Sequence, residues 1–371
     1  MAHEYDAVVV GLGTMGSQVL WRLAQAGWRV LGIDRDHPPH HLGSHHGWSR
    51  LIRFAYFEHP NYVPLLLEAA RGWSELELAS GRTLFERCGV IQGGPPRSPL
   101  IRGIIASAER HRLDVEPLDL AARERLPFSL PPTWTVLMES GAGYLHPELC
   151  IETALLQAEQ CGAEMCTGQQ VTRIDDTADW LELHTPLRHV RAKRIVLTTG
   201  AFASDWRDWN VHPPTVLRKH LFWFQPRHAT SWHVRAGCPA FLFDVGESYI
   251  YGFPAHDERG VKLARHDGGM EIDPASEDTE LGRLDELASV QKFIDDHAPG
   301  LRSEPSEHAI CRYAMSEDGD FRLGVSARDS RVVWASCFSG HGFKFAPAIG
   351  THIAHRLLES KWRPEVQFLV G

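Results

Sequence analysis

Residues 5 to 36 read YDAVVVGLGTMGSQVLWRLAQAGWRVLGIDRD and decide the fold. The apolar run at 7–10 predicts a buried strand, and residues 29–33 predict a second one. Between them the glycine-rich turn Gly11 to Gly16 is followed by a helical stretch that ends near Ala26. A strand, a G-x-G-x-x-G turn and a helix leading to a second strand are typical of a dinucleotide-binding unit.

Each glycine of this turn has a separate structural role. Gly11 permits the tight turn, Gly13 lets a pyrophosphate approach the backbone, and Gly16 lets the helix pack against the strand. The helix N-terminus then faces the phosphates, and Asp34, 23 positions after Gly11, can reach a ribose hydroxyl. This pattern leaves open whether the dinucleotide is NAD or FAD. The candidate residues of this unit are Gly11, Gly13, Thr14, Met15, Gly16, Asp34 and Arg35.

Length and composition limit the number of domains, the class of protein and its partners. A chain of 371 residues suits two domains that share a large core. Its 43% hydrophobic and 23% charged residues are typical of a globular protein. The net charge of −9, with no basic block, makes nucleic acid and anionic membranes poor partners.

Two further features favour a cytoplasmic protein. The first six residues lack a basic region of the signal-peptide type, and no apolar run reaches membrane-spanning length. The 7 cysteines form no CxxC pair, which suits a reducing compartment better than a disulfide framework.

Five histidines lie between residues 37 and 46, directly after the second strand. We find no cysteine or carboxylate at ligand spacing beside them, so we expect no metal and interpret the run as a polar loop next to the cofactor. If a helix begins at Ser49, Arg50 and Arg53 lie one turn apart and point the same way. Their apolar neighbours favour partial burial, where arginine usually holds an anion, and a solvated basic face is the alternative.

The rest of the chain alternates helices and strands. A strand ending in Thr199 and Gly200 would return the chain to the nucleotide sheet, and aromatic, β-branched strands between 216 and 313 would form a second sheet. The sequence thus predicts a dinucleotide domain assembled from separated pieces and interleaved with a sheet domain. Helices are predicted at 62–78, 99–111, 147–162 and 345–359, and strands at 170–174, 194–200, 218–225, 240–243, 249–253 and 331–335.

Several motifs in order along the chain carry a family resemblance. They are GSHHG at 43–47, RLIR at 50–53, YGFP at 251–254, CRY at 311–313 and FSGHGFKF at 338–345, with Lys262 and His266 between them. With these motifs the chain resembles the monomeric sarcosine oxidase and N-methyltryptophan oxidase family of flavin amine oxidases, which includes pipecolate oxidase.

The resemblance implies an α/β fold like that of p-hydroxybenzoate hydroxylase. A Rossmann-like FAD-binding domain would be interleaved with an α+β, sheet-rich substrate domain in a monomer. The implied FAD-binding domain comprises 1–83, 148–215 and 318–371, and the implied substrate domain comprises 84–147 and 216–317.

The same resemblance implies an oxidase of secondary amino acids. An N-methyl amino acid would be oxidised at a C–N bond to an imine, which hydrolyses and releases formaldehyde, while O₂ becomes H₂O₂. Arg53 and Lys344 would anchor the substrate carboxylate, an arginine fork plus a lysine point charge. Tyr251 and Leu242 would complete the substrate site.

Lys262 matches the oxygen-activating lysine of the family, and a fixed cation in a dry site favours electron transfer to O₂. The other catalytic candidates that the resemblance implies are Arg50, His266, Tyr251, Tyr313 and His341.

Cys311 matches the cysteine that carries the flavin covalently, with a plain buried thiol as the alternative. The cofactor-binding candidates added by the resemblance are Ser44, His45, Arg50, Val171, Gly200, Cys311, Gly340, Gly342, Phe343 and Lys344.

Some residues depart from the family pattern. Trp48, Phe54 and Phe57 stand where the family is smaller or more polar, Leu242 replaces a methionine and Gly324 a carboxylate. The substrate therefore need not be sarcosine, and larger N-methyl amino acids or cyclic imino acids such as pipecolate or proline remain alternatives. A flavin dehydrogenase or demethylase with another electron acceptor is a further alternative, which Lys262 argues against.

Overall fold

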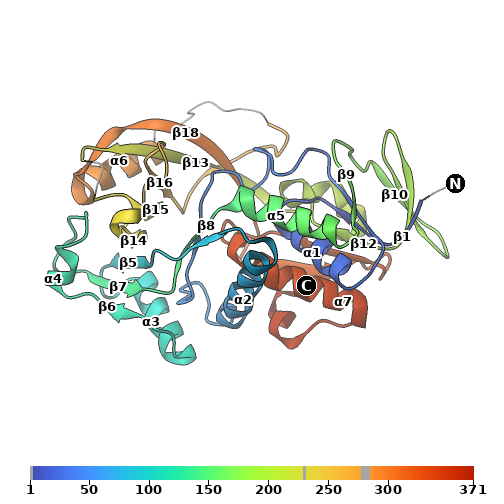
Figure 1. Cartoon of the computed structure of the whole chain (residues 1–371), viewed down its shortest axis with the longest axis horizontal. Helices are drawn as coiled ribbons and strands as arrows, with labels where there is room; N and C mark the ends of the chain where they lie inside the picture. Colours follow the sequence, from blue (N-terminus) through green and yellow to red (C-terminus); the bar gives the residue numbers. More distant parts are fainter. Residues whose placement is uncertain (1–2, 229–230, 277–284) are drawn as a thin grey trace.

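A computed structural model describes residues 3–228, 231–276 and 285–371. Strands lie at both ends of the molecule, and helices accompany each group of strands (Figure 1). The α-helices are α1 (Thr14–Gln25), α2 (Tyr62–Ser80), α3 (Pro99–His111), α4 (Leu120–Arg123), α5 (Pro147–Gln160), α6 (Asp285–His297) and α7 (Ala346–Glu359). Short 3₁₀ helices are η1 (Gly200–Trp209), η2 (Val234–Ala236), η3 (Phe343–Phe345) and η4 (Pro364–Leu369).

The first large sheet contains the predicted βαβ unit. Its strands are β1 (His3–Val10), β2 (Val30–Ile33), β9 (Glu164–Cys166), β10 (Arg173–Asp176), β11 (Leu181–His184), β12 (His189–Leu197), β19 (Arg322–Val325) and β20 (Val332–Ser336). The order is β10-β11-β12-β1-β2-β9, with β20 on β12 and β19 on β20. β1 pairs in parallel with both β2 and β12, so pieces far apart in sequence build one nucleotide sheet, as predicted.

The side chains of β1 alternate between the two faces of this sheet, and both faces are covered by other parts of the chain. Val9 packs into the core beneath α1, α5 and α7, whereas Val8 and Val10 pack on the other side with Trp206. A strand buried on both faces reads as a continuous apolar run, and residues 7–10 do so.

The second large sheet lies at the other end of the molecule (Figure 1). Its strands are β5 (Val90–Gly94), β6 (Glu116–Pro117), β7 (Thr135–Glu139), β13 (Thr215–Pro226), β14 (Ala240–Asp244), β15 (Tyr249–Phe253), β16 (Val261–Arg265), β17 (Met270–Glu271) and β18 (Leu301–Met315). The order is β17-β13-β16-β15-β14-β5-β7-β6, with β18 on β13.

Strand register decides which side chains share each face of this second sheet. On one face Phe241 and Phe243 pack with Phe293 of α6. Directly paired residues share a face, and the side chains of a strand alternate between faces. The pairings therefore give a common opposite face, termed here the cavity face, to Glu139, Gln92, Leu242, Tyr251, Lys262, Cys311 and Tyr313.

A small third sheet joins the two halves and corrects one prediction. It comprises β3 (Arg50–Ile52), β8 (Gly143–Leu145) and β4 (Phe85–Glu86). The helix considered at Ser49 is wrong, because Arg50 pairs with Leu145 in an antiparallel ladder instead.

The predicted helices at 62–78, 99–111, 147–162 and 345–359 are confirmed as α2, α3, α5 and α7 within a few residues. The strand predicted at 170–174 begins only at Arg173, which leaves Val171 in the preceding loop. The α/β prediction is confirmed, and the division into two domains with its boundaries stays a prediction. None of the helices in the described residues has the length and apolar content needed to cross a bilayer.

Candidate active site

One long cavity collects most of the residues that the sequence singled out. It holds about 1750 Å³ that protein atoms do not fill, open solvent at its mouth included. Its lining extends from the glycine turn at Gly11 and Gly13 to Arg53 and Lys344. The predicted residues that line it are Gly11, Gly13, Thr14, Met15, Asp34, Arg35, Ser44, His45, Arg50, Arg53, Val171, Gly200, Leu242, Tyr251, His266, Tyr313, Gly340, His341, Gly342, Phe343 and Lys344.

Three predicted residues do not line this cavity: Gly16, Lys262 and Cys311. Gly16 acts in packing, because a Cβ there would lie 1.8 Å from the carbonyl oxygen of Gly11. Lys262 and Cys311 lie on the cavity face of the second sheet but are covered by the segment 44–50.

The N-terminus of α1 opens one end of the cavity. Gly13 is the N-cap residue and no side chain caps the helix, so the N–H groups of its first turn remain for a ligand. A Cβ on Gly13 would meet no atom closer than His45 Nδ1 at 3.8 Å. The fold itself therefore does not require glycine at this position, whereas a phosphate lying against the helix N-terminus does.

Asp34 lies beside this helix end, as predicted. Its Oδ2 accepts a hydrogen bond from the Leu12 N–H at 2.6 Å, and its Oδ1 accepts one from the Asp36 N–H at 2.9 Å. Burial raises the pKa of Asp34, against the pull of these hydrogen bonds. The carboxylate is thus fixed by backbone and lines the cavity where a ribose would lie.

The histidine loop corrects a second expectation. His40 Nε2 lies 3.8 Å from Asp34 Oδ1, and Asp34, Asp36 and His40 could together offer ligand atoms to a metal. The statement that no carboxylate lies at ligand distance from the histidines is therefore wrong, because the loop folds back onto the end of β2. Asp34 and His40 both line the dinucleotide end of the cavity, so a ligand there competes with any metal.

Three buried polar atoms at this end have no partner among the described residues. They are His40 Nδ1, His45 Nε2 and Thr199 Oγ1, and all three residues line the cavity. His45 is only 2% exposed, and burial lowers its pKa to about 3, so the ring is neutral at neutral pH. Orphaned polar atoms facing a cavity indicate a polar ligand that completes their hydrogen bonds.

Arg53 and Glu58 form a buried ion pair at the other end of the cavity. Arg53 Nη2 donates to both carboxylate oxygens of Glu58 at 2.7 and 2.9 Å, and its Nη1 donates to the Ala55 carbonyl at 3.4 Å. Arg53 is 3% exposed. Burial opposes ionisation of Glu58, but the charge of Arg53 prevails and lowers the pKa of Glu58 to about 2.

Lys344 lies close to Arg53 at the start of η3. Its ammonium donates to the His341 carbonyl at 2.8 Å and lies 5.1 Å from the centre of the Tyr56 ring, above which Arg53 also lies. Burial, together with repulsion from Arg53, lowers the pKa of Lys344 to about 7. Two cations with one carboxylate leave this end of the cavity electropositive, which suits an anionic group of a ligand.

His341 is held by both of its ring nitrogens. Its Nε2 lies 3.0 Å from the Gly319 carbonyl, and its Nδ1 lies 2.5 Å from the Tyr56 hydroxyl. A carbonyl only accepts, so Nε2 carries the proton and Nδ1 accepts from Tyr56. Burial lowers the pKa of His341 to about 3, so the ring is neutral, and its two hydrogen bonds fix its orientation.

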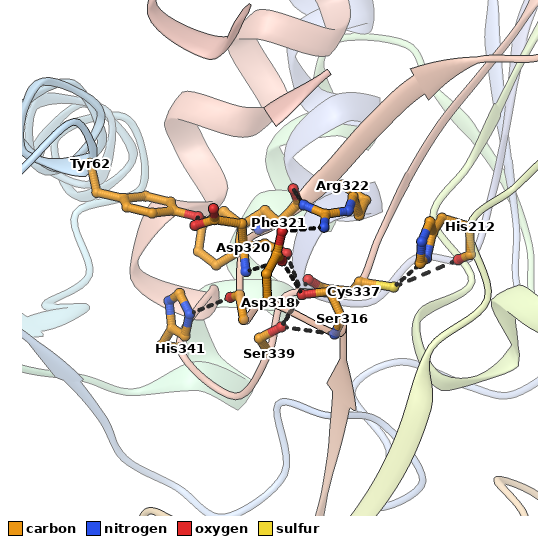
Figure 2. A network of polar contacts seen from close by, with 11 residues as sticks. Tyr62, His212, Ser316, Asp318, Asp320, Phe321, Arg322, Cys337, Ser339 and His341 are labelled. Atoms are coloured by element: carbon orange, nitrogen blue, oxygen red, sulfur yellow. Dashed lines mark hydrogen bonds and ion pairs between the residues drawn. The ribbon is translucent and has the colours of Figure 1, made fainter. Parts of the chain in front are cut away.

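Figure 2 shows how the turn at 316–320 supports His341. Asp320 accepts a hydrogen bond from the Tyr62 hydroxyl at 2.8 Å, and Ser316 N–H donates to Ser339 Oγ at 3.1 Å. Ser339 has a left-handed φ of 46°, and Gly340 follows with 74°. A Cβ on Gly340 would lie 2.2 Å from the Tyr313 ring, so this turn brings the backbone directly against Tyr313.

Tyr251, Tyr313 and His266 wall the cavity between its charged end and the second sheet. His266 Nδ1 lies 3.5 Å from the Tyr313 hydroxyl, and burial lowers the pKa of His266 to about 4. Burial raises the pKa of Tyr251 to about 12. Leu242 pairs with Tyr251 across the sheet and adds an apolar surface. At neutral pH this wall is uncharged.

Lys262 is fully buried, and its ammonium forms hydrogen bonds with backbone carbonyls. It donates to the carbonyls of Gly47 at 2.7 Å and Ser49 at 3.0 Å, and to Ser49 Oγ at 3.2 Å. The Trp223 and Phe253 rings lie 5.6 and 4.8 Å from it. Burial, with repulsion from Arg50, lowers the pKa of Lys262 well below its usual range.

Arg50 links this region to Cys311. Its Nη2 donates to Cys311 Sγ at 3.1 Å and to the carbonyls of His46 at 2.5 Å and Ser44 at 3.1 Å. Cys311 is 1% exposed, and its thiol lies 3.4 Å from the Ser44 carbonyl. Since Arg50 and Ser44 line the cavity, the thiol lies one residue behind its wall.

Sequence reasoning missed several residues of the site. Glu58, Glu139 and Glu148 carry no motif, and their partners are set by folding. Glu58 alone had a local signal, because an acid five positions after a buried arginine is an available counter-charge.

Comparisons with known proteins agree with this geometry. Residues 6–356 match the sequence model of a family described as FAD dependent oxidoreductase. The N-methyl-L-tryptophan oxidases of Yersinia pestis (strain Pestoides F) and Yersinia pseudotuberculosis (serotype O:1b, strain IP 31758) are each 35% identical over 357 residues, covering 94% of this chain and 93% of theirs.

Solved structures share the fold at lower identity. NikD, described as an unusual amino acid oxidase essential for nikkomycin biosynthesis, superposes in its open form with a TM-score of 0.85 at 22% identity, over 100% of this chain and 98% of that chain. L-proline dehydrogenase from P. horikoshii gives a TM-score of 0.83 at 17% identity, over 99% and 96% of the two chains.

Proposed function

Because this chain belongs to the FAD dependent oxidoreductase family, we propose that it oxidises secondary amino acids, N-methyl amino acids above all, and passes the electrons to O₂. The substrate C–N bond becomes an imine, which water hydrolyses, and an N-methyl group leaves as formaldehyde. O₂ takes two electrons and two protons to become H₂O₂. The observation that carries this proposal is the buried pair Arg53 and Lys344 at one end of a cavity whose other end fits a dinucleotide.

The residues present fit FAD. The open space before Gly13, the uncapped α1 and the orphaned His45 Nε2 suit the pyrophosphate half, and Asp34 suits a ribose. FAD, when bound, supplies the two-electron acceptor for the amine. The residues proposed to hold it are Gly11, Gly13, Thr14, Met15, Gly16, Asp34, Arg35, Ser44, His45, Arg50, Val171, Gly200, Cys311, Gly340, Gly342, Phe343 and Lys344.

Substrate orientation follows from the charged end. The carboxylate of an amino acid would replace part of the charge that Glu58 supplies and bind Arg53 through a fork, with Lys344 as a second cation. The amine would then lie against the neutral wall of Tyr251, His266 and Tyr313. An uncharged, desolvated setting favours the neutral amine, which is the form that can be oxidised.

The side chain of the substrate meets apolar surface. Leu51, Phe57 and Leu242 line the cavity near Arg53, and Phe57 packs 5.6 Å from the Tyr249 ring. This supports an N-methyl amino acid with a large apolar side chain over sarcosine. It is also in keeping with the relatives, which are named for N-methyl-L-tryptophan.

Lys262 would serve the oxygen step. Burial lowers the pKa of Lys262, but its nitrogen has three acceptors, the Gly47 and Ser49 carbonyls and Ser49 Oγ, which only an ammonium can satisfy together. The ammonium would present a fixed charge where electrons leave for O₂. Arg50 adds a second, half-buried charge nearby and would keep the segment 44–50 in place. His341 would position Tyr56 rather than move a proton, since both ring nitrogens are engaged.

We expect Cys311→Ser to release the flavin from covalent attachment. The proximity of the thiol to the cavity wall and to Arg50 supports a bond between Cys311 and FAD. Acid precipitation should leave the yellow colour in the pellet of the wild type and in the supernatant of the variant. Colour in the wild-type supernatant would show that the cofactor is not covalently bound.

The binding of a carboxylate should depend on pH through Lys344. Its pKa of about 7 means that the ammonium is charged below pH 7 and neutral above it. The dissociation constant of indole-2-carboxylate, which has no aliphatic amine of its own, should therefore rise above pH 7, by at most about tenfold per pH unit. Calorimetric titration from pH 6 to 9 measures this, and Lys344→Met should flatten most of the dependence. An equally steep profile in that variant would assign it to another group.

We expect the chain to act as a monomer in the cytoplasm. The acidic net charge of −9 and the seven cysteines, none of which forms a disulfide, support this proposal. Light scattering of the holoenzyme should give a mass near 41.7 kDa, and twice that value would contradict it.

A substrate panel tests the function. Peroxide and formaldehyde should form in equal amounts from N-methyl amino acids, with the highest kcat/KM for a bulky apolar side chain. Peroxide without formaldehyde from pipecolate or proline, at a higher kcat/KM, would establish the cyclic imino acid alternative. No peroxide from any member, with a dye reduced instead, would establish a dehydrogenase.

A further inference from the structure

Two glutamates, the buried Glu139 and the partly exposed Glu148, each hold a pair of consecutive backbone N–H groups next to the site. Glu139, at the end of β7, is 3% exposed. Its Oε1 accepts hydrogen bonds from Phe54 N–H at 2.6 Å and Ala55 N–H at 3.3 Å, and its Oε2 also lies 3.3 Å from Ala55 N. Glu148, in the first turn of α5, accepts from Gly47 N–H at 2.8 Å and from Trp48 N–H at 3.1 and 3.2 Å.

The segment held by Glu139 carries the substrate anchor. It begins at Arg53 and continues to Glu58, the two residues that form the ion pair at the charged end. Arg53 also donates to the carbonyl of Ala55, so the position of that peptide sets the direction of the guanidinium. Glu139 reaches this segment from the cavity face of the second sheet, 84 to 85 residues away in sequence.

The segment held by Glu148 contains the backbone carbonyls that bind Lys262. Ser49 N–H donates to the Gly47 carbonyl at 2.8 Å across Trp48, which has a left-handed φ of 62°. A hydrogen bond between residues i and i+2 around such a residue is a γ-turn, a rare and strained form. Strain of this kind persists only where the surroundings over-determine it. Glu148 on the N–H side and Lys262 on the carbonyl side provide that support.

Glu148 also supplies negative charge where cations gather. Lys262 and Arg50 both contact the turn at 44–49, and His46 Nδ1 lies 3.6 Å from Glu148. Burial opposes the charge of Glu148, but His46, Arg50 and the two N–H donors lower its pKa to about 2, so it stays ionised. The two glutamates act at different places: Glu139 holds the segment beside Arg53, and Glu148 holds the turn that binds Lys262.

We propose that Glu139 and Glu148 are positioning residues that set the two halves of the site separately, Glu139 the carboxylate anchor and Glu148 the turn that fixes Lys262. This inference rests on the proposed function, in which Arg53 binds substrate and Lys262 promotes the reaction with O₂. It goes beyond that function because neither residue lines the cavity, and each is assigned to a different half of the reaction.

Alanine variants of both residues test the proposal in the holoenzyme. Glu139→Ala leaves two buried N–H groups unpaired and should raise the dissociation constant of indole-2-carboxylate at least tenfold, equal to about 1.4 kcal/mol. Its rate of reoxidation by O₂, after anaerobic reduction, should stay within about twofold of wild type. Glu148→Ala should slow reoxidation at least about tenfold and leave carboxylate binding within about twofold.

Glutamine variants separate positioning from general damage. Glu139→Gln and Glu148→Gln keep an acceptor oxygen of nearly the same shape, so most of the lost binding or reoxidation should return. If an alanine variant fails to fold, Glu139→Asp and Glu148→Asp, which keep the carboxylate but are one methylene too short to reach the N–H groups, should show the same selective losses. Equal losses in both steps for both alanine variants, or no loss in either, would overturn the proposal.

Arg53→Met and Lys262→Met serve as reference variants. If Arg53→Met leaves carboxylate binding unchanged, or Lys262→Met leaves reoxidation unchanged, the proposed function of that residue fails. If the reference variants behave as expected and both Glu139→Ala and Glu148→Ala match wild type, only the present inference fails.

Discussion

Replacing Lys262 with methionine should slow the reaction with O₂ by about 100- to 1,000-fold, the effect of removing one preorganised charge from a dry catalytic site. The ammonium is fully buried and fixed by the Gly47 and Ser49 carbonyls, so water cannot take over its role. Stopped-flow mixing of the substrate-reduced holoenzyme with oxygenated buffer measures the rate.

Reduction by substrate provides the internal control for Lys262→Met. The anaerobic bleaching rate should stay within about twofold of wild type, because Lys262 does not line the cavity proposed to bind the substrate. A matching loss in both steps would show that the substitution disturbs the site as a whole. An unchanged reoxidation rate would remove Lys262 from the oxygen step.

Arg53→Met should lower kcat/KM for N-methyl amino acids by at least about a thousandfold. The substitution removes a charge-assisted fork to the substrate carboxylate, and each such hydrogen bond contributes about 1.5 to 3 kcal/mol. It also leaves Glu58 buried beside the carboxylate without its partner, which adds repulsion. Steady-state peroxide formation measures the change.

Two further variants separate these causes. Arg53→Lys keeps the charge but lacks the fork, so it should recover only part of the loss. Arg53→Met combined with Glu58→Gln removes the unpaired carboxylate and should bind the substrate better than Arg53→Met alone. A double variant with no improvement would show that Glu58 does not oppose the substrate.

The nucleotide half of the fold follows from local sequence. The apolar run at 7–10, the spaced glycines and the strand before Asp34 form a unit whose periods and turn chemistry are short-range, and the structure confirms it as β1, α1 and β2. Helices α2, α3 and α5 likewise have apolar faces or proline starts that are visible in sequence.

Long-range pairing decided what the sequence could not. Arg50 and Arg53 seemed to suit a helix, yet residues 50–52 pair with 143–145 and form a strand. Propensity over so short a segment is weak, and a partner nearly a hundred residues away overrides it. Folding of the histidine loop onto Asp34 escaped spacing arguments for the same reason.

The acidic residues of the site show most clearly what cannot be predicted from the sequence. Arg53, Lys262 and Lys344 stand within motifs, so a family resemblance was enough to single them out. Glu139 and Glu148 hold backbone N–H groups, which any sequence offers, across separations of 84 to 101 residues. Such contacts acquire meaning only when the fold places them.

Anaerobic mixing of the yellow holoenzyme with an N-methyl amino acid of bulky apolar side chain tests the central claim most directly. The account predicts that the flavin absorbance bleaches with saturation kinetics, and that admitting O₂ restores it with one peroxide and one formaldehyde per flavin. An absorbance that stays unchanged with N-methyl and cyclic amino acids alike would contradict the account.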